Sequence, residues 1–325
     1  MKEKILDQEE KEMTYKELVE EWLAEKRYYV KASTLALYKY QMEKYILPAI
    51  GKYVVTDITE DMLQMQLRTW EEQKTQTGKY LKQSTIQNLI TLIKQTLHFA
   101  VRKEYINSCN VKLYWSKKNV EPFDDNKMTF SHHEQQLILQ HVADILTPEA
   151  VGIALCLCGG LRIGEICALQ WRDIDLEKRT IRISKTVQRI YNKETSPHTQ
   201  IVITSPKTQT SNRIVPLSER MYKMLIALSP KDKDSFFLSG NDYPIEPRRY
   251  RKYYQCFLMK SDIPYRKFHA LRHTFATRCV ENGGDYKCIS ELLGHSSINI
   301  TMNRYVHPGL EQKRYVVGLL DKENY

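Results

Sequence analysis

Arg162 stands where a positive charge could meet an anion. It lies in the stretch CGGLRIGEICALQWRDID, which begins at Cys158, and a helix is expected to start near Gly164 after two glycines end the preceding apolar helix. A guanidinium beside the free N–H groups of a helix start favours an anion, and Glu165 could hold the arginine in place. Taken alone, this stretch is better explained by a surface ion pair.

The stretch FHALRHTFATRCVENG, from Phe268 to Gly283, predicts a helix with two different faces. Its apolar residues gather on one side, and His269, Arg272 and His273 gather roughly opposite, beside a small alanine. A histidine and an arginine one turn apart, over a small residue, leave space for a ligand oxygen.

The same helix raises the alternative of a zinc site. His269 and His273 are four residues apart, as two zinc ligands on a helix would be. However, Ala270 stands where a zinc peptidase needs its glutamate base, and no third ligand is evident in the sequence. The sequence therefore disfavours a metal site.

Two further stretches contain a lysine and a histidine–tyrosine pair. Lys207, in SPKTQTSNRIVPL, is expected at the exposed tip of a hairpin, where it could donate a proton but would by default be only a surface charge. In ELLGHSSINITMNRYVH, Gly294 predicts a left-handed helix stop that fixes His295, and Tyr305 follows about two turns into the next helix. By local pattern Tyr305 is a packed helical aromatic.

The elements that must position these residues fall into two domains joined by a linker. Helices near 14–26, 33–45, 59–73 and 84–103 predict a small all-helical bundle at 14–112, after a charged tail at 1–13. A polar linker is expected at 113–128, a mainly helical domain with a small antiparallel β-sheet at 129–312, and a tail at 313–325. The predicted strands are 180–184, 201–205 and 213–217, the last two as a hairpin.

Composition sets broad limits on function. The chain has 325 residues, 42% of them hydrophobic, and no apolar run near the roughly 18 residues of a membrane helix. The charged N-terminus does not resemble a secretory signal, so a cytoplasmic protein is expected. Seven cysteines without metal-site spacing read as reduced and mostly buried. A net charge of +10, spread along the chain, suits a polyanion such as nucleic acid but decides little by itself.

Taken together, the motifs resemble those of the tyrosine recombinases, the phage-integrase family. The family's arginine, lysine, His-x-x-Arg, Leu-Gly-His and tyrosine motifs occur in order as GLRIGE, SPKTQ, HALRHTFATR, ELLGHSS and NRYVH, between about residues 129 and 310. The bundle at 14–112 resembles the SAM-like core-binding domain. Two positions depart from the family pattern: Gly159 replaces a common threonine, and Ala270 a common aspartate.

The resemblance implies a site-specific recombinase that cuts and rejoins DNA through a 3′-phosphotyrosyl intermediate without metal, cofactor or ATP. It implies a homotetramer on double-stranded attachment sites and leaves open an accessory or directionality factor. Tyr305 would be the nucleophile, His269 its base and Lys207 the acid for the leaving oxygen, while fixed cations meet the charge on the phosphate. The implied catalytic residues are Arg162, Lys207, His269, Arg272, His295 and Tyr305.

Several alternatives remain at this point. An integrase of a phage or conjugative element is the leading hypothesis, although such integrases often carry an N-terminal arm-binding domain and this chain starts about 13 residues before its bundle. A resolvase-type recombinase shares the same chemistry, as more distantly does a type IB topoisomerase. A catalytically inactive architectural DNA-binding protein is the third hypothesis. The apolar patch at 315–320 could dock on its own domain or on a neighbouring protomer.

Overall fold

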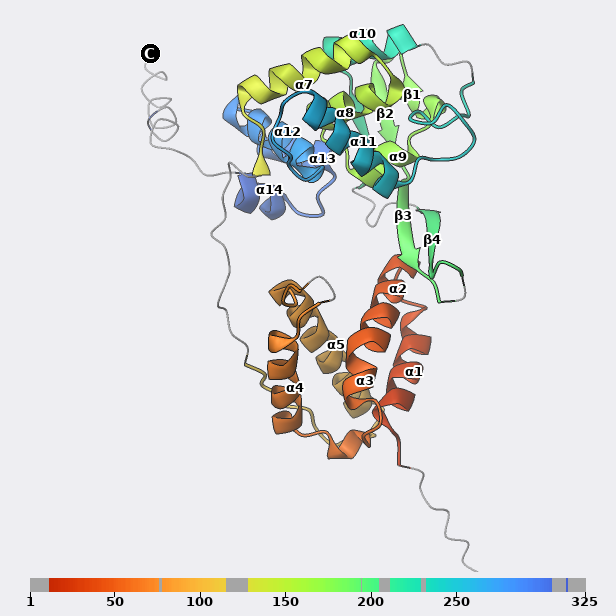
Figure 1. The fold of residues 1–325 in the computed structure, drawn as a ribbon, viewed down its shortest axis with the longest axis vertical. Helices are drawn as coiled ribbons and strands as arrows, with labels where there is room; N and C mark the ends of the chain where they lie inside the picture. The colour runs from red at the N-terminus through yellow and green to blue at the C-terminus, as the bar shows by residue number, and fades with distance from the viewer. Residues whose placement is uncertain are drawn as a thin grey trace, which may run out of the picture. The chain divides into compact units, whose positions relative to one another are not determined.

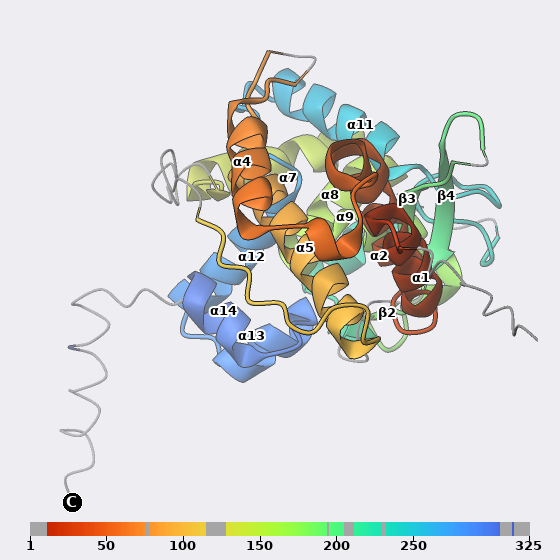
Figure 2. The same ribbon diagram turned by 90° about the horizontal axis from the view of Figure 1, so that it is seen from below.

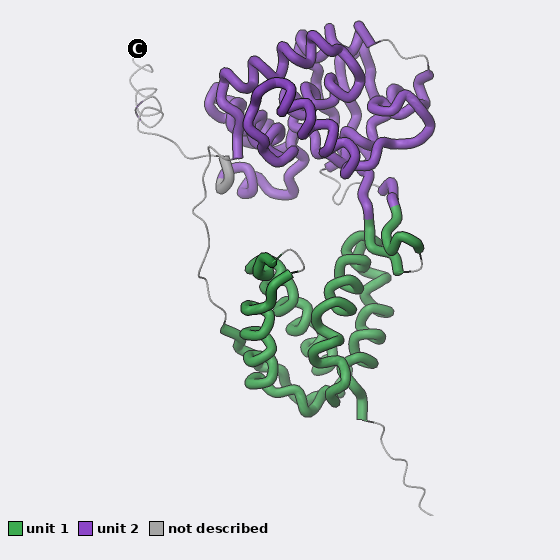
Figure 3. Tube along the Cα trace, viewed as in Figure 1, with its two compact units in different colours: residues 1–122, 190–200 green, residues 123–189, 201–325 purple. Residues whose placement is uncertain are grey.

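The computed structural model describes residues 12–75, 78–114, 128–193, 195–204, 211–228, 232–305 and 314. The chain forms two compact units (Figure 3): Met1–Pro122 with Ile190–Gln200, and Phe123–Arg189 with Ile201–Tyr325. Helices dominate, and the strands form two small sheets, one of three strands and one of two. The predicted fold class, mainly helical with a small antiparallel sheet, is confirmed.

The first unit is a helical bundle in which α5 packs against α1 and α4 (Figure 1). Thr14 caps α1: its hydroxyl accepts from the N–H of Glu17, and the Glu17 carboxylate accepts from the N–H of Thr14 at 2.9 Å, which confirms the predicted capping box. The helices are α1 Tyr15–Lys26, α2 Ala32–Gln41, the π-helix η1 Met42–Ile46, α3 Leu47–Ile50, the 3₁₀-helix η2 Val55–Asp57, α4 Glu60–Glu72 and α5 Gln83–Arg102.

Apolar side chains fill the core of this bundle. The long amphipathic helix α5 buries one face against Trp22 of α1 and Trp70 of α4, as its helical periodicity predicts. Inside this core the hydroxyls of Tyr15 and Thr96 lie 2.5 Å apart. The bundle is therefore held mainly by burial of apolar surface.

The second unit is built around helix α8, which is buried along almost its whole length and packs against α7, α10, α11 and α12 (Figure 1). Thr147 caps its start, and Gly160, at φ 68°, ends it. The helices are α7 His132–Ile145, α8 Pro148–Gly159, α9 Ile163–Ala168, the 3₁₀-helix η3 Trp171–Asp173, α10 Glu219–Leu228, α11 Pro247–Lys260, α12 His269–Glu281, α13 Tyr286–Leu293 and α14 Ile298–Tyr305.

The strand pairing differs from the prediction. Strands β1 Ile174–Asp175, β2 Thr180–Ile183 and β5 Arg213–Pro216 form an antiparallel sheet in the order β1-β2-β5, whereas β3 Thr186–Tyr191 pairs with β4 Thr199–Thr204. The predicted hairpin of 201–205 with 213–217 is therefore wrong, and β3 was not predicted. Register explains the pairing: Val215 and Arg213 lie opposite Ile181 and Ile183, and all four side chains are buried.

Helices α12, α13 and α14 contact one another and lie side by side in both views (Figures 1 and 2). Within the described part of the chain, no helix has the length and apolar character to cross a membrane. All seven cysteines are free thiols, but only Cys156 and Cys167 are buried, so the expectation that most are buried is wrong. The exposed thiols are those of Cys256 and Cys288.

Candidate active site

Arg162 lies in the turn between α8 and α9, as the sequence predicts. Gly160 turns the chain in the left-handed region, and Arg162 is the N-cap residue of α9. The carboxylate of Glu165 accepts hydrogen bonds from the Arg162 N–H at 2.9 Å and from Nη1 at 2.7 Å, which confirms that Glu165 holds the arginine. The Arg162 side chain remains 34% exposed, so a ligand can still reach it.

Arg272 comes from α12 and is almost completely buried, 2% exposed. Its Nη1 donates to the carbonyl oxygen of Gly160 at 2.8 Å, and its Nη2 donates to that of Leu293 at 2.5 Å. The guanidinium thus joins the end of α8 to the end of α13. Both acceptors are carbonyls at helix C-termini, where the backbone carries partial negative charge and lacks intrahelical donors.

The C-terminus of α13 receives hydrogen bonds from three arginines of three different elements. Arg213, on β5, was missed by the sequence analysis; its burial follows from the alternation of inward residues at 213, 215 and 217, which could have indicated it. Nε of Arg213, Nη2 of Arg272 and Nη2 of Arg162 donate to the carbonyl oxygens of Leu292 at 2.5 Å, Leu293 at 2.5 Å and Gly294 at 3.1 Å, respectively.

His295 follows this helix end directly. Gly294 adopts φ 61°, the predicted left-handed stop, and the His295 N–H donates to the carbonyl oxygen of Ser290 at 3.0 Å. The ring nitrogen Nδ1 lies 2.8 Å from the hydroxyl of Thr301, a fully buried residue of α14. The imidazole is thus oriented from two sides, by the end of α13 and by α14.

His269 is the first residue of α12, three residues before Arg272. Its ring packs edge to face against that of His273, with ring centroids 4.5 Å apart. The side chain of His273 is 3% exposed and is therefore buried in the second unit. Among the residues that the structure describes, no group of three or more His, Cys, Asp or Glu side chains could hold a metal ion.

The carboxylate of Glu165 accepts hydrogen bonds from both Arg162 and Arg213. Burial alone would raise the pKa of its carboxyl, but hydrogen bonds and charge from Arg213, together with the charge and N–H of Arg162, lower that pKa to about 2. Both carboxylate oxygens accept from Arg213, at 3.0 and 2.9 Å. At neutral pH the carboxylate is therefore ionised and balances part of the positive charge of two arginines.

These residues lie in a region that the family comparison also covers. Residues 128–311 match the phage integrase family, and residues 14–70 match the phage integrase N-terminal SAM-like domain. The first match alone covers more than half of the chain. The chain belongs to the phage integrase family.

Named relatives of this integrase include recombinases of mobile elements. It is 30% identical to a XerC-like tyrosine recombinase of Caldanaerobacter subterraneus subsp. tengcongensis, over 79% of this chain and 70% of the relative. It is 26% identical to the ICEBs1 integrase of Bacillus subtilis, over 87% of this chain and 77% of that protein. The Tn916 transposase of Enterococcus faecalis is 30% identical over 53% of this chain and 45% of its own length. The protein is thus a tyrosine-type site-specific recombinase.

Solved structures share the fold of the integrase. The Tn1549 transposon integrase in complex with transposon right end DNA superposes with a TM-score of 0.75 at 23% identity, over 95% of this chain and 100% of that chain. A lambda integrase dimer bound to a COC′ core site gives a TM-score of 0.63 at 16% identity, over 92% and 97% of the two chains. At these identities the likeness shows the fold alone.

The six predicted catalytic residues of this integrase are described unequally. Arg162, Arg272 and His295 converge on the end of α13, and His269 lies one turn from Arg272 on α12. Tyr305 is the last residue of α14, but its side chain lies outside the described part of the chain. Lys207 also lies outside the described residues, between β4 and β5.

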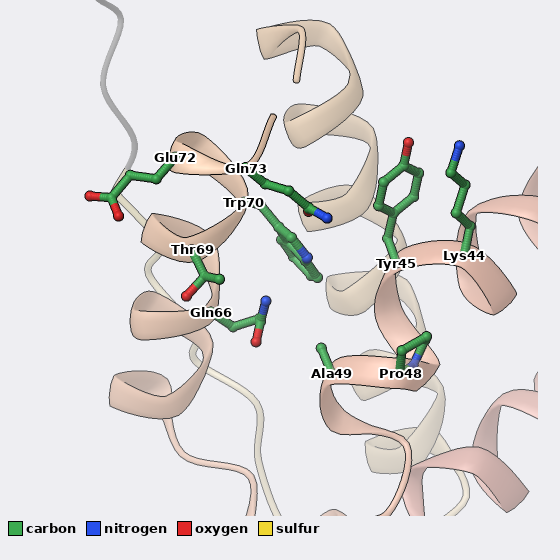
Figure 4. A pocket seen from close by; sticks show the side chains of 9 residues that line it. All are labelled: Lys44, Tyr45, Pro48, Ala49, Gln66, Thr69, Trp70, Glu72 and Gln73. Atoms are coloured by element: carbon green, nitrogen blue, oxygen red, sulfur yellow. The ribbon is translucent and has the colours of Figure 1, made fainter. Parts of the chain in front are cut away.

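Each unit of the integrase also has a surface groove. In the second unit, a groove of about 550 Å³ runs along β5 and the end of α13, and Arg213 and His295 line it. In the first unit, a groove of about 510 Å³ lies between α4 and the η1–α3 segment (Figure 4). Gln66 and Trp70 line one side of it and Lys44 and Tyr45 the other. The second-unit groove thus borders the arginine cluster, while the first-unit groove combines an aromatic wall with polar side chains.

Proposed function

We propose that this recombinase integrates and excises a mobile element, cutting and rejoining double-stranded DNA through a 3′-phosphotyrosyl intermediate. The observation that carries the proposal is the convergence of Arg162, Arg272 and His295 on the end of α13, one short turn before the helix that ends at Tyr305. Such a cluster presents fixed positive charge and N–H donors to one phosphate.

The phosphate is the group that needs this cluster. When a phosphodiester is attacked, its two non-bridging oxygens gain charge in the transition state. Arg162 and Arg272 each offer a planar fork of donors, and His295 adds another, so fixed side chains can supply the charge stabilisation that a metal ion supplies in many nucleases. The reaction as proposed uses neither metal nor ATP.

The proposed cleavage step exchanges one ester for another. The Tyr305 oxygen attacks phosphorus and forms the P–O bond of the phosphotyrosine, and its proton passes to His269 as base. The bond from phosphorus to the 5′ oxygen breaks, and Lys207 protonates that oxygen. A free tyrosine hydroxyl, with a pKa of about 10, is a weak nucleophile at neutral pH and needs such a base. Attack by a 5′ hydroxyl of another strand reverses the step, so the ester energy is retained.

Joining two duplexes requires four such cleavages, one for each strand. Because each protomer offers one nucleophile, four protomers are needed around the two sites. A lambda integrase tetramer bound to a Holliday junction has a related fold, with a TM-score of 0.63, and supports this stoichiometry. The helical first unit would bind the duplex beside the cleavage point, as its SAM-like match suggests. A resolvase-type recombinase, which would use the same chemistry, is the second candidate, since one relative is described as a XerC-like tyrosine recombinase and not as an integrase.

A nicked suicide substrate tests the chemistry. The DNA duplex spans the junction between the element and its flanking DNA, with a nick beside the scissile phosphate, and the reaction contains EDTA. The wild-type protein should form a covalent adduct that resists SDS, and Tyr305→Phe should form none. Tyr243→Phe is the matched control, because Tyr243 is 80% exposed and lies outside the site. A wild type without adduct, or an adduct formed by Tyr305→Phe, would overturn the proposal.

A further inference from the structure

Arg213 makes four hydrogen bonds from inside the second unit. Its side chain is only 6% exposed. Nη1 and Nη2 donate to the two carboxylate oxygens of Glu165, Nε donates to the Leu292 carbonyl at 2.5 Å, and Nη1 also reaches the Ser211 carbonyl at 3.4 Å. These contacts join β5 to α9, 48 residues earlier, and to α13, 79 residues later.

We propose that Arg213 is a positioning residue for DNA cleavage. It would act through two neighbours: Glu165, whose carboxylate holds Arg162, and the last turn of α13, which precedes His295. The inference rests on the function proposed for this site. Arg213 itself would not touch DNA, because its Nε, Nη1 and Nη2 all donate to protein acceptors and the edge formed by Nη1 and Nη2 faces both oxygens of Glu165.

The planar shape of the guanidinium supports a positioning role, which a buried positive charge of another shape could not fill. One edge of the group meets both oxygens of Glu165, while Nε points in another direction, to the Leu292 carbonyl. A lysine ammonium is a single compact charge and cannot reproduce this planar fork. Arg213→Lys would therefore keep the charge near Glu165 but release either the carboxylate geometry or the helix end.

A change at Arg213 would affect Arg162 and His295, two groups that would meet the phosphate. Glu165 balances Arg162 and Arg213 together, so a shift of Arg213 moves the carboxylate that orients Arg162. The α13 carbonyls held by Arg213, Arg272 and Arg162 are consecutive, so the loss of one anchor loosens the turn that orients His295. Small misplacements of about 1 Å cost catalysis about 10²-fold.

Arg213→Lys in the full-length protein tests the inference on two substrates. One suicide DNA has an ordinary scissile phosphate, and the other has a neutral methylphosphonate, which lacks one charged oxygen. At saturating DNA, the single-turnover cleavage rate on phosphate should fall about 10²-fold. On methylphosphonate the deficit should shrink to about tenfold or less, because the displaced donors have less charge to meet. DNA affinity should stay within about threefold, because Arg213 does not touch DNA.

Arg179→Lys is the matched control. Arg179 also donates to a carboxylate, that of Glu219 at 2.7 Å, but it is half exposed and lies at the β1–β2 turn. The Arg179→Lys variant should cleave both substrates at the wild-type rate. If Arg213→Lys does not fold, the double variant Arg213→Met with Glu165→Gln removes both buried charges together and should show the same substrate dependence.

Two results would overturn the inference. The first is a wild-type cleavage rate in Arg213→Lys. The second is an equal deficit on phosphate and methylphosphonate, which would mean that Arg213 only stabilises the fold. A wild-type protein that forms no adduct on either DNA would instead refute the proposed function, so the two failures are distinguishable.

Discussion

The two units place their positive charges differently. In the described part of the first unit, surface cations lie over aromatic rings, as Lys26 does over the buried Trp22 and Lys74 over the exposed Tyr80. Its buried polar residues, Gln41 and Thr96, are uncharged. In the second unit, by contrast, two arginines are themselves buried, Arg213 and Arg272.

We expect this difference to separate DNA affinity from cleavage rate. A cation over an aromatic ring stays hydrated and accessible, so it can contact a DNA phosphate without distorting the fold. A buried guanidinium has lost its hydration and is stabilised only by fixed acceptors, here Glu165 and helix-end carbonyls. Its strict orientation is what transition-state stabilisation requires. Changes in the first unit should therefore alter binding, and changes in the second unit should alter rate.

Arg272→Gln should give the largest effect. Each Nη of Arg272 carries a second N–H besides the one donated to a helix-end carbonyl. The loss of these two donors, each worth about 10²-fold when aimed at developing charge, should lower the single-turnover cleavage rate about 10⁴-fold at saturating DNA. Arg102→Gln in the first unit is the control, because Arg102 is exposed and pairs with Glu25 at the surface. Its rate should stay within about twofold. Similar losses in both variants would remove the distinction between the units.

Glu165→Gln should strongly destabilise the fold. It leaves Arg162 and Arg213 without their carboxylate, and breaking a buried ion pair costs about 3 to 5 kcal/mol in the free energy of unfolding. Glu25→Gln, which breaks surface pairs with Arg102 and Lys103, should cost less than about 1 kcal/mol. Urea unfolding of the full chain measures both. Equal costs would mean that the buried cluster is electrostatically no different from a surface pair.

Acid should destabilise the second unit through Glu165. The folded pKa of about 2 lies below the ordinary value of 4.5, so the ionised carboxylate favours the folded state above pH 4.5. That contribution, on the order of 3 kcal/mol, is lost as pH falls from about 4.5 towards 2. Hydrogen exchange of α9 and α13, corrected for intrinsic rates, should accelerate across this range. In Glu165→Gln the same segments should show a weaker pH dependence, and an unchanged one would exclude Glu165 as the cause.

Local signals made much of this architecture predictable. The capping box at Thr14, the helix end at Gly160 and the left-handed stop at Gly294 depend on a few adjacent residues, and the structure confirms all three. The pairing of Arg162 with Glu165 is equally local, three residues apart. The sequence therefore located the turn that carries Arg162 and the helix end that fixes His295.

Contacts between residues far apart in the sequence could not be predicted from local patterns. Strand β5 follows β4 in the chain but pairs with β2, because that register buries Arg213 and Val215 beside Ile183 and Ile181. Arg213 and Leu292 are 79 residues apart in the sequence, and the periodicity of helices and strands does not predict such a contact. Motif spacing thus predicted which groups would react, but it did not predict the side chain that connects their supports.

Lys44→Gln should give the smallest effect of these variants, and that effect should be on DNA affinity alone. Lys44 is exposed at the edge of the first-unit groove, and the hydroxyl of Tyr40 accepts a hydrogen bond from its ammonium at 2.8 Å, which raises the pKa of Lys44 and keeps it charged. If this lysine contacts a phosphate, its loss should weaken DNA binding about two- to fivefold for every sequence and reduce the salt slope of log K by about 1.

The rate at saturating DNA separates this effect from catalysis. In Lys44→Gln the single-turnover rate should equal that of the wild type, since the contacts described for Lys44 are with Tyr40 and Tyr45 of its own unit. Lys223→Gln is the control, an exposed lysine on α10 paired with Glu219, and should leave the salt slope unchanged. A lower rate with unchanged affinity in Lys44→Gln would contradict the division, because a surface cation of the first unit would then contribute to the transition state.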